Sequence, residues 1–188
     1  MIVMEKSKKP YHSTYQNQIL SALFSPTFPI GTFSYSHGLE AAIAAGAVSD
    51  LDSAEKWIKA CLVSGNGRND AIIFAHSWRA KPDEQDFLNR LSFALCASAE
   101  RDKETRELGR NFHNIAARVY QIEVKGIKPI AYPVIAGIAA RQLHCELSLS
   151  LVFFLQSFVS NLISVVVRTV PIGQSEGQVI LHRLMSWI

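Results

Sequence analysis

Apolar residues recur three and four positions apart along most of the chain, which is the spacing of one face of an α-helix. This pattern predicts helices over residues 15–24, 33–45, 53–62, 70–82, 87–96, 100–120, 133–144 and 147–167, with a last one after Gln174. Strand signals are few, because Gly126 and Pro129 interrupt the weak alternation of residues 122–130. The pattern therefore predicts an all-α, single-domain bundle of roughly eight to ten helices. We expect residues 1–13 to form a disordered tail and residues 14–188 to form the domain.

One predicted helix is unusually apolar. Residues 147–167 contain no charged side chain and are long enough to span a bilayer, so a small membrane-anchored α-helical protein is one interpretation. The other is a central buried helix, because one stripe of this segment is polar: Gln156, Ser157, Ser160, Asn161 and Ser164. We favour the buried helix and a protein with no membrane contact. Ser157, Ser160, Asn161 and Ser164 would then meet their own copies across a two-fold axis, as the interface of a homodimer.

Composition narrows the function classes. Apolar residues make up 48% of the chain and charged residues only 19%, which suggests additional buried surface between subunits. The net charge of +3 is too small and too evenly distributed for a nucleic-acid-binding protein. The three cysteines are far apart and odd in number, and the N-terminus has no apolar signal segment. We therefore expect a reducing, cytoplasmic location.

Two motifs of common catalytic sites are absent from the sequence. It has no HExxH or GxxxxGK[ST] pattern, which predicts a protein that is not an enzyme and has neither a resident cofactor nor a GTP site. His144 and Cys145 form the only adjacent pair of soft ligands, and they are weak metal candidates because neighbouring helical residues point about 100° apart. An alternative is a metalloenzyme that uses these two residues with His113.

Residues 25–40, Ser-Pro-Thr-Phe-Pro-Ile-Gly-Thr-Phe-Ser-Tyr-Ser-His-Gly-Leu-Glu, interrupt the helical pattern. Two prolines exclude a continuous helix, and Thr32 is a candidate N-cap for the helix predicted over 33–45. Small hydroxyl residues beside Tyr35 and Gly38 would let another backbone approach closely. This contact is either inside the subunit or with a partner protein.

Residues 97–109, Ala-Ser-Ala-Glu-Arg-Asp-Lys-Glu-Thr-Arg-Glu-Leu-Gly, carry charges of alternating sign. On a helix this usually indicates a solvated face with pairs four residues apart. The alternative is a polar contact with a protein partner.

Three stretches resemble the UreF family of urease accessory proteins. Residues 25–40 match the pattern SPxxPxGxxSxSxGLE, and Glu100, Thr105 and Gly109 match a Glu followed five positions later by Ser or Thr and nine later by Gly. Residues 168–178 resemble the segment RxxPLGQxxGQ. The chain departs from the pattern at Asp102, where many relatives carry Arg. Relatives also continue past this last segment with another helix and a tail, so we expect a shortened or naturally truncated chain.

The resemblance implies an all-α homodimer that acts as a scaffold or chaperone in nickel insertion into urease. Its partners would be UreD (also called UreH), the GTPase UreG and the urease apoprotein. Nickel would be handled transiently by the complex. The residues that the resemblance assigns to partner binding are Ser34, Tyr35, Ser36, Gly38, Glu40, Glu100, Thr105, Gly173, Gln174 and Gln178.

Overall fold

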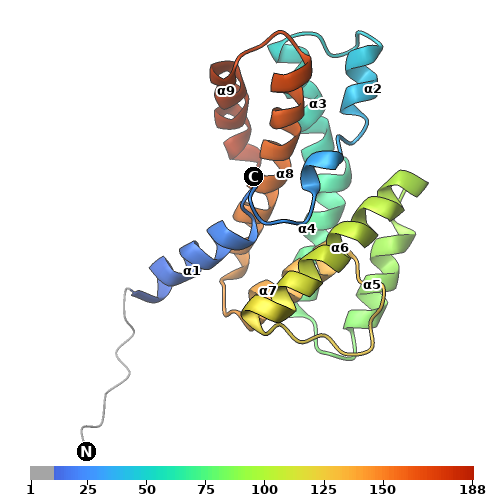
Figure 1. Ribbon diagram of the computed structural model, residues 1–188, viewed down its shortest axis with the longest axis vertical. Helices are drawn as coiled ribbons and strands as arrows, with labels where there is room; N and C mark the ends of the chain where they lie inside the picture. Colours follow the sequence, from blue (N-terminus) through green and yellow to red (C-terminus); the bar gives the residue numbers. More distant parts are fainter. Residues whose placement is uncertain (1–10) are drawn as a thin grey trace, which may run out of the picture.

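The computed structural model describes residues 11–188, which form helices joined by short loops (Figure 1). Nine α-helices lie in this part of the chain: α1 (Tyr11–Leu23), α2 (Leu39–Ala44), α3 (Leu51–Val63), α4 (Asn66–Arg79), α5 (Gln85–Ala94), α6 (Ala99–Tyr120), α7 (Tyr132–Gln142), α8 (Leu147–Thr169) and α9 (Gln174–Leu184). Two short 3₁₀ helices, η1 (Thr32–Ser34) and η2 (Met185–Trp187), complete them. The predicted all-α bundle is confirmed. Residues 11–13 of the predicted tail belong to α1, and residues 1–10 lie outside the described part.

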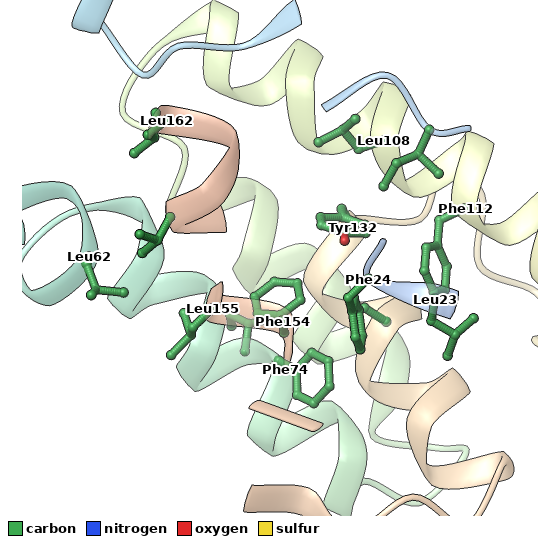
Figure 2. Close-up of a cluster of buried hydrophobic side chains, with 14 of the residues drawn as sticks. Leu23, Phe24, Leu62, Phe74, Leu108, Phe112, Tyr132, Phe154, Leu155 and Leu162 are labelled. Atoms are coloured by element: carbon green, nitrogen blue, oxygen red, sulfur yellow. The ribbon is translucent and has the colours of Figure 1, made fainter. Parts of the chain in front are cut away.

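The helices form two groups that α4 and α8 connect (Figure 1). At one end α8 packs against α2, α3 and α9, and at the other end α7 packs against α4, α5 and α6. An aromatic cluster lies where α4, α6, α7 and α8 meet, and Figure 2 shows its rings: Phe24, Phe74, Phe112, Tyr132 and Phe154. Their ring centroids are 4.9–6.4 Å apart, within the usual range for aromatic pairs. This cluster is the centre of the hydrophobic core.

Two glycines permit the closest helix contacts. A Cβ atom added to Gly109 of α6 would lie 2.0 Å from the carbonyl oxygen of Ile130, just before α7. A Cβ atom added to Gly137 of α7 would lie 2.5 Å from the carbonyl oxygen of Phe74 in α4. Any side chain at these positions would force backbones apart, so glycine is required by packing.

The helix predicted over residues 33–45 is wrong. The chain forms η1, then an irregular loop, and α2 begins only at Leu39. Gly31, His37 and Gly38 have positive φ angles of 88°, 52° and 78°, which end a right-handed helix at each point. Gly38 is therefore the N-cap of α2 and not a residue inside a helix, so its glycine is explained by φ and not by a close helix contact.

Two further expectations concern helix starts. The helix expected over residues 53–62 begins at Leu51 and is capped by Asp50, whose Oδ1 accepts a hydrogen bond from the Ser53 N–H at 2.8 Å. The helix expected from Asp70 begins four residues earlier, at Asn66, because Gly65 and Gly67 permit a tight junction between α3 and α4.

The apolar segment forms α8, with 23 residues. Within the described residues it is the one helix long and apolar enough to cross a membrane by length and composition. In this structure it is instead packed against other helices, with buried residues such as Phe154, Val159 and Leu162 on its inner face. This packing favours the buried-helix interpretation over the membrane anchor.

Candidate functional site

A surface groove of about 530 Å³ brings together two of the three motifs. Ser34, Tyr35, Ser36 and Gly38 line one wall, from the loop between η1 and α2. Glu100 and Lys103, from the first turns of α6, line the other. Residues about 65 positions apart in the sequence thus share one site. This confirms no binding role by itself, but it shows that the predicted residues share a surface.

The loop of this groove, residues 35–38, is held by side chains from three helices. The Tyr35 hydroxyl donates to Glu107 Oε2 of α6 at 2.6 Å, and the Tyr35 carbonyl oxygen accepts from Asn161 Nδ2 of α8 at 3.0 Å. The ring of His37 lies 3.1 Å from the Asn66 side-chain amide of α4. His37 has a positive φ although it is not glycine, and such backbone strain is kept only where the surroundings hold it. The loop is therefore fixed in one shape.

A buried charge cluster lies under the loop. Arg101 of α6 donates to both oxygens of Asp70 in α4, at 2.5 and 2.7 Å, and pairs with Glu104 at 2.9 Å. His37 Nε2 lies 3.2 Å from the other oxygen of Glu104. All four side chains are 13% exposed or less. A buried ion is tolerated only when it is paired and hydrogen-bonded, and each member of this cluster has partners.

The charges in the cluster are tuned by one another. Burial raises the pKa of Glu104, but the hydrogen bond with His37 and the Arg101 guanidinium outweigh burial and leave it below its ordinary value. Burial also raises the pKa of Asp70, and Arg101 opposes that rise. Since Arg101 donates to both oxygens of Asp70, we treat this carboxylate as ionised. The cluster holds α4, α6 and the loop together through ionised groups.

The prediction of a solvated face over residues 97–109 is therefore wrong for half of the segment. Arg101, Glu104 and Thr105 are buried, although Asp102 and Arg106 form the expected surface pair at 3.0 Å. The physical reason is the spacing of the buried residues, which continue as Leu108 and Phe112 along the same helix face. That spacing was visible in the sequence. The partner charge Asp70, which lies 31 residues earlier, carried no such signal.

Thr105 lies inside the protein. Its Oγ1 accepts a hydrogen bond from the Tyr132 N–H at 3.1 Å and so supports the start of α7. In this conformation it cannot touch a partner. Glu40 is exposed on α2 but does not line the groove.

The third motif forms a separate surface. Gly173 is the N-cap of α9, where its N–H donates to Glu176 Oε2 at 3.0 Å. Gln174 and Gln178 are exposed on the first turns of this helix. None of these three residues lines the groove. The sixteen-residue motif and this segment thus define two different faces.

The polar stripe proposed as a dimer interface lies partly inside the subunit. Ser157 lines an internal cavity, and Asn161 donates to Tyr35 within the same chain. The Ser164 hydroxyl donates to the Asn161 carbonyl oxygen at 2.7 Å, and Ser160 is half-buried. The homodimer stays a prediction, with fewer free polar groups on α8 than the sequence suggested.

The weak metal candidates are not arranged as a metal site. Cys145 is buried, which raises the pKa of its thiol to about 11 and disfavours the thiolate that binds metals. His144 is exposed at a helix end with a positive φ. Within residues 11–188 no three His, Cys, Asp or Glu side chains are grouped to hold a metal ion.

Comparison with known proteins identifies the class as accessory proteins and not catalytic enzymes. The family model of UreF matches residues 48–185. Urease accessory protein UreF of Ruegeria pomeroyi is 40% identical over 166 residues, which cover 88% of this chain and 75% of that protein. The UreF proteins of Cereibacter sphaeroides (strain KD131) and Roseobacter denitrificans are 45% and 37% identical, over 85% and 90% of this chain and 74% and 75% of their own lengths. The chain belongs to the UreF family.

Proposed function

We propose that this protein acts in urease maturation as a scaffold that recruits the GTPase UreG, together with UreD, to the urease apoprotein for nickel insertion. In this proposal it works in the cytoplasm as a homodimer, nickel is cargo, and the nucleotide binds to UreG. The family supports the general role. The particular partners and steps are inferred.

The observation that carries the proposal is the fixed loop of the groove. Binding costs less free energy when a surface is ordered before its partner arrives. The loop is already held by Glu107, Asn161 and the buried cluster beneath His37. Beside it the ring of Phe33 is 67% exposed on η1. Aromatic residues are enriched in protein interfaces relative to the rest of the surface.

The sharpest test reverses one charge of the groove. Glu100 is exposed and lines the groove, so Glu100→Lys should reduce co-purification of UreD and UreG at least about tenfold, which corresponds to about 1.4 kcal/mol of binding free energy. Asp83→Lys is the matched control, because Asp83 is an equally exposed carboxylate outside the groove. Both purifications are run with and without GTP, and melting temperatures show that both variants are folded. Equal recovery of partners by the two folded variants would place partner binding elsewhere.

The homodimer is tested separately. Sedimentation of the chain at micromolar concentration should show a dimer. A monomer across the whole concentration series would remove the homodimer from the proposal without affecting the partner test.

A further inference from the structure

A small cavity lies beneath the groove, where the buried charge cluster approaches the aromatic core. Its volume is about 30 Å³, and its walls come from η1, α4, α6, α7 and α8. A cavity needs a volume of about 10–15 Å³ to hold a water molecule, so this one is large enough. Polar groups line it on several sides, among them Thr32, Asp70, Glu104 and Ser157.

Tyr132 brings a polar atom into this region from the core. Among the side chains labelled in Figure 2, it alone carries an oxygen. The residue is only 8% exposed and lines the cavity, and its hydroxyl makes no hydrogen bond to another side chain or backbone group of the described residues. The hydroxyl oxygen is not among the unpartnered side-chain atoms that are wholly shut off from water, which in the described residues are Trp57 Nε1 and Ser77 Oγ, so a water molecule can reach it.

The same cavity offers hydrogen-bond acceptors. Asp70 and Glu104 together carry two negative charges against the single positive charge of Arg101. Burial, with the nearby charges of Asp70 and Glu104, raises the pKa of Tyr132, which keeps its hydroxyl protonated as a donor. A molecule between them must therefore accept from a hydroxyl and donate to a carboxylate, and water does both. A metal ion is a poor fit, since the described residues form no three-ligand group here.

We propose that this cavity is an internal hydration site that binds one water molecule, which bridges the Tyr132 hydroxyl and the Asp70–Glu104 carboxylates. The water links the aromatic core to the charge cluster that holds the loop of the groove. The proposal stands on the cavity and its walls and does not depend on the partner-binding function.

The first test uses the sign of a stability change. Tyr132→Phe removes only the hydroxyl. If a water bridges it, the melting temperature should fall by about 2–4 °C, because a domain of this size loses that much per kcal/mol. If the hydroxyl has no partner, its removal relieves a desolvation cost and the melting temperature should stay or rise. An unchanged or raised value overturns the proposal.

Tyr120→Phe is the matched control, because Tyr120 is half-buried at the end of α6 and does not line the cavity. Its melting temperature should change by no more than about 1–2 °C, which is what surface substitutions usually cause.

The second test is a high-resolution crystal structure of the unmodified chain, which gives an answer even if the variant fails to fold. We expect an ordered water within about 3 Å of Tyr132 Oη and of an oxygen of Asp70 or Glu104. A direct hydrogen bond from Tyr132 to either carboxylate, or a cavity with no density, overturns the hydration site.

Discussion

The two longest helices, α6 and α8, bury similar shares of their residues, although their sequences suggest a large difference. α6 has 22 residues and is densely charged, yet it buries Arg101 and Glu104. α8 has 23 residues with a long uncharged segment, yet Val152 is exposed and other apolar residues, such as Leu151, are only half-buried. The share of polar residues in a helix therefore does not by itself decide how many of its residues are buried.

The difference lies in the partners that each helix finds. The charges of α6 meet Asp70 and His37, so their burial is compensated. The polar groups of α8 are satisfied more simply, by single backbone oxygens such as that of Tyr35. Ion pairs tie α6 into the fold, whereas apolar packing and isolated hydrogen bonds tie α8. The predictions below test this contrast.

The largest effect is expected for Arg101→Ala. It leaves the buried carboxylates of Asp70 and Glu104 without their shared cation, and breaking a buried pair typically costs 3–5 kcal/mol. At about 2–4 °C per kcal/mol, the melting temperature should fall by roughly 6–20 °C. Arg106→Ala is the control, because its pair with Asp102 is exposed and worth about 0–1 kcal/mol. Equal falls in melting temperature in both variants would mean that the buried cluster stabilises the fold no more than the exposed pair does.

A somewhat smaller effect is expected for Gly109→Ala. The added methyl group would collide with the backbone at Ile130, and overpacking of this kind costs about 1–3 kcal/mol. Urea denaturation should show a lower midpoint with an unchanged slope. Asn114→Ala, at an exposed position of the same helix, should stay within about 0.5 kcal/mol of the unmodified protein. A neutral Gly109→Ala would show that α6 and the start of α7 are less close than described.

For α8 we expect a loss of about 0.5–1.5 kcal/mol from Asn161→Ala, the usual net value of one hydrogen bond. The loss should be local, because Asn161 holds the loop of the groove through Tyr35. Hydrogen exchange should therefore speed up at residues 35–38 and remain unchanged in α6. Gln156→Ala, at an exposed position of α8, is the control. Unchanged hydrogen exchange at residues 35–38 would show that this hydrogen bond does not stabilise the loop.

The smallest effect is a loss of stability that appears only at acidic pH. The pKa of Glu104 in the folded protein lies below its unfolded value, so the unfolded state binds the proton more readily. The stability that Glu104 contributes is present above the unfolded pKa, near 4.3, and is lost as the pH falls through the lower folded pKa. Urea midpoints measured from pH 7 down to pH 3 should fall less steeply in Glu104→Gln than in the unmodified protein. Parallel curves would contradict the assignment.

Helix positions were predictable because apolar periodicity records burial directly. The helices expected over residues 100–120 and 133–144 agree with α6 and α7 within two residues. The loop before α2 was not predictable in the same way, because the positive φ of His37 depends on Asn66 and Glu104, which are distant in the sequence. The groove was anticipated only as a set of motif residues. The buried charge pair beneath it, Asp70 and Arg101, required the fold, since no local pattern shows which charges will meet.

Tyr35 also has a mechanical consequence for the molecule. Its hydroxyl is attached to α6 and its carbonyl oxygen to α8, so one residue measures the spacing between two helices. If that spacing changed by about 1 Å, one of the two hydrogen bonds would exceed the length at which it is effective, while both helices stayed intact. The loop would then lose one of its anchors while the helices remained folded. A change in the spacing of α6 and α8 would thus reach, through Tyr35, the surface where we propose that partners bind.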